Sequence, residues 1–245
     1  MSNLLASPLD LVVLVALGVT AGAVTTTVGM GGGLLLIVVL SAQVGPKQAL
    51  ALSAIPLLLG NVQRAYLYRE ALDRRRATAF CAGAAPAALV VGWSLATTPA
   101  VVIRSVLVAL TVFALLQGMG LIRWQPRPVA LMPAGAAIGG LTATAGGAGI
   151  LTAPLLMASG LRGGAYLATA SAIAATMHLA RLTGYGAAGL VHRSTFAGAA
   201  ALALAVMGGN LAGRRLRQHV PPRWEQPLIY GVLVLCVAAA VLGIG

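Results

Sequence analysis

The sequence predicts an all-α fold, a polytopic bundle of transmembrane helices that contains two internal repeats, and three observations predict it. Of the 245 residues, 59% are hydrophobic and only 8% are charged, whereas about a quarter of the residues of a soluble domain are charged. Apolar stretches that are long enough to cross a ~30 Å hydrocarbon layer as helices follow one another with short interruptions. The second half of the chain also repeats the pattern of the first.

Polar and Pro/Gly-rich positions divide the chain into ten apolar segments, five in each half. They span residues 9–28, 31–42, 48–68, 77–96 and 100–122, and then 129–145, 148–159, 165–186, 194–213 and 227–245. The two short segments, 31–42 and 148–159, reach only ~18 Å as helices, which is too short for an untilted crossing. We therefore expect eight full spans and two short or re-entrant half-helices.

The two halves can be laid over each other, without a gap, at a constant offset of 117 residues. The matched pairs include Gly18/Gly135, Gly22/Gly139, Thr25/Thr142, Thr27/Thr144, Gly29/Gly146, Gly32/Gly149, Leu50/Leu167, Arg64/Arg181 and Tyr68/Tyr185. The Arg and Tyr pairs carry the most weight, because Gly and Ala are common in this chain. We therefore expect a first transmembrane repeat, residues 1–125, and a second, residues 126–245, which together form one membrane domain.

The 16 Lys and Arg residues and the 4 Asp and Glu residues give a net charge of +12. The basic residues cluster in short connections, as is typical of membrane proteins, so we expect no nucleic-acid partner. If both short segments cross the membrane, four loops that together hold eleven Arg lie on the same side, namely 69–76, 123–127, 158–164 and 214–223. The loops on the other side of the membrane then hold only Lys47 and Arg193. The positive-inside rule then predicts inverted repeats, with the Arg-rich loops 69–76 and 214–223 in the cytoplasm.

A cluster rich in Thr and Gly precedes the short segment of each repeat. Gly at this density disfavours a continuous helix, so we expect the chain to unwind there and to restart as a half-helix whose N-terminus faces an anion. The alternative is close helix packing through small residues. The candidate substrate-binding residues of the two clusters are Thr25, Thr27, Gly29, Gly31 and Gly32, and Thr142, Thr144, Gly146, Gly147 and Gly149.

The third segment of each repeat carries a polar stripe at helical spacing. Ser53, Asn61, Arg64 and Tyr68 form the first stripe, and Ser171, His178, Arg181 and Tyr185 form the second. An Arg within a span usually faces the bundle interior or a water-filled route, and its guanidinium suits oxyanions such as carboxylate, sulfite or sulfonate. The alternative for both Arg residues is snorkelling to the interface.

Asn61, Arg64, Ser171, His178 and Arg181 complete the set of candidate substrate-binding residues. The imidazole of His178 has a reference pKa near 6.5, so it is also a candidate for exchanging a proton near neutral pH. A neutral hydrogen bond between helices is the alternative for His178.

Other chemistry has no support in the sequence. The four carboxylates lie near the N-terminus or in loops, so the Asp/Glu relay of many proton-driven pumps is missing. We find no nucleotide-binding motif, no nucleophile–base set and no metal-ligand spacing, and we therefore expect no enzyme activity, no cofactor and no metal. Cys81 and Cys236 lie in apolar segments and are expected to be free thiols.

The order of these elements resembles the sulfite exporter TauE/SafE family of membrane permeases. The resemblance covers nearly the whole chain and rests on Gly18-xxx-Gly22, then Gly29-Met-Gly-Gly-Gly33, a short apolar run and a Ser/Ala-rich helix, all repeated after residue 135. It implies a bacterial inner-membrane protein that moves sulfite, sulfoacetate or a related anion along a path between the repeats. Many members carry a Pro after the first Gly cluster. The run Leu34 to Leu40 has none, although Pro154 stands in the second, so the first short segment is expected to be the more regular helix.

We therefore expect a permease that exports a small sulfur-containing anion (sulfite, sulfoacetate or a related organosulfonate) by alternating exposure of a site between the repeats. Its expected partners are that anion, the lipid bilayer and, as a further candidate, protons, and a homo-oligomer is left open. The alternatives are a permease for another small carboxylate or zwitterion, or a non-transporting membrane assembly subunit. The subunit would have a dry repeat interface without a cavity that reaches Arg64 or Arg181.

Overall fold

A computed structural model describes residues 8–119, 131–146 and 149–219, together with Leu121, Pro221 and Gly231. Its regular elements are all helices, and no strand occurs among the described residues. They are α1 Pro8–Val28, α2 Gly32–Val44, α3 Pro46–Leu67, the 3-10 helix η1 Arg69–Ala71, α4 Arg74–Ser94, α5 Ala100–Gly118, α6 Leu131–Ala145, α7 Gly149–Ala158, α8 Gly163–Ala187 and α9 Arg193–Arg217. The all-α prediction is confirmed, and α1 to α9 follow the first nine predicted segments within a few residues. The segment 227–245 lies outside the described residues except for Gly231.

Three helical stretches are long and apolar enough to cross a membrane by length and composition: Pro8–Val28, Arg74–Ser94 and Phe196–Arg217. Shorter apolar helices accompany them, including α2 and α7. Large apolar side chains, such as Leu9, Trp93 and Leu204, are exposed on the outside of the bundle, as expected where lipid replaces water. The exact number of full spans stays a prediction.

The helices break at both Gly clusters. Between α1 and α2, Gly29 and Gly31 have φ angles of 90° and 92°, and Gly146, after α6, has a φ of 64°. Residues with side chains rarely adopt such angles, so glycine allows the chain to turn there and to start a new helix. The short helix α2 runs for 13 residues without a Pro, whereas α7 has 10 residues and contains Pro154. The expected difference between the two short segments is therefore present.

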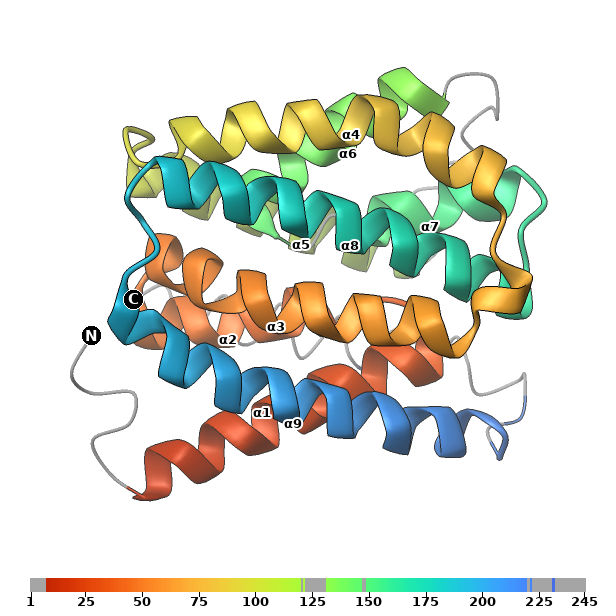
Figure 1. Cartoon of the computed structure of the whole chain (residues 1–245), viewed down its shortest axis with the longest axis horizontal. Coiled ribbons are helices and arrows are strands. Elements are labelled where there is room, and N and C mark those ends of the chain that lie inside the picture. The colour runs from red at the N-terminus through yellow and green to blue at the C-terminus, as the bar shows by residue number, and fades with distance from the viewer. Residues whose placement is uncertain are drawn as a thin grey trace.

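The helices of the two halves are interleaved (Figure 1). Helices α3 and α8 pack against each other in the middle of the bundle, α1 packs on α9, and α4 packs on α6. At an offset of 117 residues, α1 corresponds to α6 and α4 to α9, so the two outer pairs are equivalent contacts. Helices α3 and α8 run antiparallel, because the end of α3 contacts the start of α8 and the start of α3 contacts the end of α8. The division of the chain into two repeats stays a prediction that agrees with these contacts.

The Arg-rich connections lie at one end of the bundle. There Arg76 donates to the carbonyl of Ser159 at 2.8 Å, and Arg217 donates to the carbonyl of Thr27 at 3.0 Å. Asp73 caps α4 by accepting from the backbone N–H of Arg76, and these contacts hold the pKa of the Asp73 carboxyl below its ordinary value. At the opposite end, Lys47 donates to the carbonyl of Ala96 at 2.7 Å.

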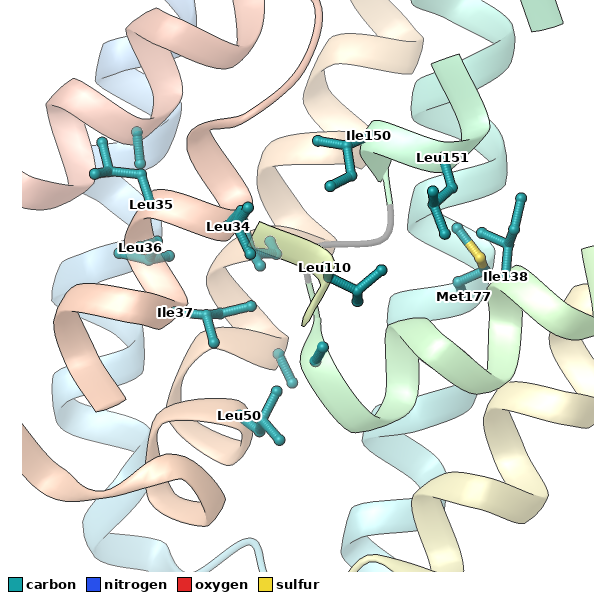
Figure 2. Close-up of a cluster of buried hydrophobic side chains, with 14 of the residues drawn as sticks. Leu34, Leu35, Leu36, Ile37, Leu50, Leu110, Ile138, Ile150, Leu151 and Met177 are labelled. Carbon is teal, nitrogen blue, oxygen red and sulfur yellow. The ribbon is translucent and has the colours of Figure 1, made fainter. Parts of the chain in front are cut away.

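Glycine brings the helix backbones into direct contact. A Cβ atom at Gly22 of α1 would collide with the carbonyl of Val206 in α9, and one at Gly139 of α6 would collide with the carbonyl of Ala84 in α4. The Gly-xxx-Gly pairs thus let helix backbones pack closely, as small residues do in membrane proteins. Between the halves, Leu34, Ile37 and Leu50 lie in one buried cluster with Ile150 of α7 and Met177 of α8 (Figure 2).

The close α1–α9 contact yields a stability prediction. Gly22→Ala is expected to destabilise the protein by ~1–3 kcal/mol, because the added methyl group has no room and the helices must separate. Gly208→Ala is the matched control, because it changes a helical glycine of α9 whose Cβ would meet nothing within 4 Å. The measurement is the thermal midpoint of the detergent-purified protein. Equal midpoints for the two variants would contradict the close contact.

Candidate functional site

A cavity of about 80 Å³ lies between the two halves of the chain. Roughly 10–15 Å³ of such space is enough for one water molecule, so the cavity has room for a small ligand. The helices that line the cavity come from both halves, namely α1, α2, α3, α6, α7, α8 and α9. Of the residues that the sequence singled out, those on the cavity wall are Thr25, Gly29, Gly31, Asn61, Arg64, Thr142, Gly146, Gly149, Ser171 and His178.

Arg64 places a positive charge on the cavity wall. It occupies the last turn of α3, and its side chain is only 5% exposed. The Nε atom donates to the Ser171 hydroxyl of α8 at 2.9 Å, and Nη2 donates to the side-chain oxygen of Asn61. None of its hydrogen bonds or ion pairs within the described residues involves a carboxylate. The snorkelling alternative is therefore wrong for Arg64, which is buried inside the bundle without a negative counter-charge there.

Both short helices contribute their N-termini to the same cavity. Gly31, Gly33 and Leu34 line it from the start of α2, and Gly149 and Thr152 line it from the start of α7. The first N–H groups of a helix have no partner within the helix, and they carry the positive end of the helix dipole. Together with Arg64, these termini make the cavity electropositive, which is the electrostatic requirement for holding an anion.

His178 and Arg181 differ in their position relative to the cavity. His178 of α8 lines the cavity, is 5% exposed, and has no hydrogen-bond partner for Nδ1. Arg181 is fully buried and does not line the cavity. Its Nη2 donates to the Ser53 hydroxyl at 3.4 Å, and its Nη1 donates to the carbonyl of Thr142 at 3.5 Å. It therefore lies behind the cavity wall that Thr142 forms, and snorkelling is wrong for Arg181 as well.

Other predicted residues point away from the cavity. Thr27 donates to the carbonyl of Gly213 at 3.3 Å, Gly32 packs against the carbonyl of Ala21, and Thr144 bonds to the carbonyl of Leu141 in its own helix. The geometric reason is that residues two apart on a helix differ by about 200° in direction, so Thr25 and Thr27 cannot share a face. Gly147 lies outside the described residues. A substrate-binding role stays a prediction for all the candidates.

Tyr166 and Asn210 are two of the cavity residues that the sequence analysis missed. The Tyr166 hydroxyl of α8 donates to the carbonyl of Gly29 at 3.1 Å and so joins α8 to the break after α1. Asn210 of α9 is fully buried, accepts from the Thr26 hydroxyl at 2.9 Å and donates to the carbonyl of Gly60 at 2.9 Å. An amide within an apolar segment is a detectable signal for Asn210, whereas nothing local distinguishes Tyr166.

The comparison with known families agrees with this geometry. The profile of the sulfite exporter TauE/SafE family matches residues 14–241. The chain belongs to this family. As a TauE/SafE protein it is a multi-pass membrane protein of a transport family, whose members are permeases for small anions in a lipid bilayer rather than enzymes. No curated protein and no solved structure matches the chain.

The glycine at the first break yields a second prediction. Gly29→Ala is expected to destabilise the protein more than Gly189→Ala, although both glycines have a positive φ angle. The positive φ angle costs both variants ~1–2 kcal/mol, but only at Gly29 would the new Cβ meet the Tyr166 ring, at 2.9 Å, whereas a Cβ at Gly189 would meet nothing within 4 Å. Thermal midpoints in detergent give the comparison. An equal loss in the two variants would mean that Tyr166 does not pack on this break.

Proposed function

We propose that the chain is a permease that exports sulfite, sulfoacetate or a related organosulfonate from the bacterial cytoplasm through the cavity between its two halves. The observation that carries the proposal is the buried guanidinium of Arg64 on the cavity wall, whose partners within the described residues are neutral. A charge within a span is unfavourable by at least ~2.5–3.5 kcal/mol, and an anionic ligand offsets that penalty.

The neighbours of Arg64 favour a small oxyanion. Ser171 and Asn61 hold the guanidinium in place, and a planar guanidinium binds two oxygens of an oxyanion at once. The volume of about 80 Å³ favours a small ligand. A cation would be repelled by Arg64 and by the N-termini of α2 and α7.

We also propose that the two halves are inverted repeats and that the Arg-rich end of the bundle faces the cytoplasm. The equivalent contacts of α1 with α9 and of α6 with α4 support the first statement. The position of the Arg-rich connections at one end of the bundle supports the second (Figure 1). Arg64 then lies nearer the cytoplasm, because α3 leads directly into η1 at that end.

The non-transporting subunit is the weaker alternative, because it requires a dry interface and a cavity reaches Arg64. A carboxylate or zwitterion permease would use the same cavity. Competition separates these substrates, because sulfite and sulfoacetate should displace one another and should be displaced poorly by an amino acid.

Arg64→Gln is expected to lower the efflux of radiolabelled sulfite and sulfoacetate from proteoliposomes by at least about tenfold, because a charge-assisted hydrogen bond contributes ~1.5–3 kcal/mol. Arg69→Gln is the matched control, because Arg69 is exposed on η1 and its side chain contacts Tyr66 at the end of α3. It should transport within about twofold of the wild type, since such exposed charges have small energetic effects. Unchanged efflux in folded Arg64→Gln would contradict the anion site.

Protons are the second proposed partner, through His178. His178 lines the cavity, and its Nδ1 has no hydrogen-bond partner among the described residues. The cationic side chains of Arg181 and Arg64 oppose its protonation, so a proton would bind together with an anion that offsets these charges. His178→Gln should keep sulfite efflux but remove its dependence on an imposed pH gradient, because Gln forms hydrogen bonds without titrating. A gradient dependence that survives in this variant would exclude His178 as the proton-exchanging group.

A further inference from the structure

Arg181 repeats the contacts of Arg64 from the other half of the chain. Arg64, near the end of α3, bonds to Ser171 near the start of α8, and Arg181, near the end of α8, bonds to Ser53 near the start of α3. Each guanidinium therefore reaches across the α3–α8 contact to a serine of the other half.

The surroundings of the two guanidinium groups also match in part. Beside Arg64, the cavity wall includes Gly29 and Leu167, and a Cβ at Gly29 would lie 3.7 Å from Leu167. Beside Arg181, a Cβ at Gly146 would lie 2.6 Å from Nη1 and 3.2 Å from Leu50. At the offset of 117 residues, Gly29 corresponds to Gly146 and Leu167 to Leu50. One matched Gly–Leu pair thus occurs in each place, whereas Tyr166 at Gly29 and Ile37 at Gly146 have no counterpart of the same type.

The surroundings of Arg64 and Arg181 differ in whether a cavity lies beside the guanidinium group. Arg64 lines the cavity, whereas Arg181 is 0% exposed and does not line it. Ile37 of α2 and Leu50 of α3 crowd against Gly146, and Figure 2 shows both side chains in the packed cluster between the halves. The Tyr185 hydroxyl, which bonds to the carbonyl of Ala143, ties the end of α8 to α6.

The buried guanidinium of Arg181 makes few good hydrogen bonds. Its hydrogen bonds to Ser53 and Thr142 are long, at 3.4 and 3.5 Å, and its buried Nε has no hydrogen-bond partner among the described residues. The Tyr185 ring, whose centroid is 5.7 Å from the guanidinium carbon, adds a cation–π contact but no negative charge. Buried charges are normally paired and fully hydrogen-bonded. Gly146 and Thr142 contact Arg181 and also line the Arg64 cavity, so a single wall separates this unpaired donor from the space in front of Arg64.

We propose that Arg181, Ser53 and Gly146 form a second anion-binding site, which is closed in this conformation and opens toward the end of the bundle opposite the Arg-rich loops. The inference rests on the proposed function and takes the same ligand class, a small oxyanion. The anion contacts Arg64 first and Arg181 second. Opening requires Ile37 and Leu50 to move away from Gly146, and the two sites open in alternation because they share one wall.

The test is the reactivity of single cysteines from each side of the membrane. In full-length protein that carries Cys81→Ser and Cys236→Ser, Ser171→Cys and Ser53→Cys are reconstituted into vesicles and treated with a membrane-impermeant, anionic thiosulfonate reagent. Glu70→Cys and Thr97→Cys are the sidedness controls, because both residues are exposed in connections at opposite ends of the bundle. We expect Ser171→Cys to react from the side that labels Glu70→Cys, and Ser53→Cys to react from the side that labels Thr97→Cys.

Sulfoacetate on the Arg-rich side should slow the labelling of Ser171→Cys by about tenfold, as expected for a ligand held by charged hydrogen bonds. Sulfoacetate is used here because sulfite itself reacts with thiosulfonates. An unreactive Ser53→Cys, in vesicles where Ser171→Cys reacts and wild-type protein transports sulfite, would overturn the second site and leave the proposed function standing. Reaction of both cysteines from the same side would also overturn it. Absence of sulfite and sulfoacetate flux in the wild type would instead contradict the proposed function.

Variants of Arg181 give a second measurement that does not depend on the cysteines. Arg181→Gln should keep the equilibrium binding of sulfite at the Arg64 site in detergent within about twofold, while lowering efflux by about tenfold. Arg181→Lys retains the charge and should recover part of the efflux. Normal efflux in Arg181→Gln, or loss of binding and efflux together in a folded variant, would contradict a separate second site.

Discussion

The pair of buried guanidinium groups between α3 and α8 is the constraint on which the rest of the structure depends. Each group is held by a serine of the opposite helix, and neither is paired with a carboxylate among the described residues. A cation within a span is unfavourable unless it faces a polar route or a ligand. The antiparallel α3–α8 contact thereby holds a row of polar side chains, the two Arg–Ser pairs, inside a bundle whose outer surface carries large apolar side chains.

The glycine-rich breaks in the helices border the cavity beside these polar side chains. Glycines at positive φ end α1 and α6 inside the bundle, and the N-termini of α2 and α7 then face the cavity beside Arg64. Unpaired backbone is tolerated at membrane depth where it lines a protein-enclosed space. A second set of glycines has the opposite effect, because Gly22 and Gly139 let helix backbones touch and exclude any space. Position on the helix therefore decides whether a glycine opens the bundle or closes it.

Much of this organisation could be predicted from the sequence, because apolar length, glycine density and polar spacing are local properties. They predict the helix bounds, the breaks before α2 and α7, and the shared face of Asn61 and Arg64. Arg64 and Arg181 are equivalent in the sequence, yet only Arg64 lines the cavity. That difference depends on how the neighbouring helices pack around each guanidinium, which the residue types at the two positions do not indicate. Tyr166 was missed for a related reason, since its partner Gly29 comes from a distant segment.

The most direct test of the anion site is a crystal structure of the protein grown with selenite, in which selenium replaces the sulfur of sulfite and can be located by its anomalous scattering. The account predicts a selenium peak in the cavity between the halves, with its oxygens within hydrogen-bond distance of the Arg64 guanidinium. Selenium found only at the exposed Arg residues of the connections, with no peak beside Arg64, would contradict it.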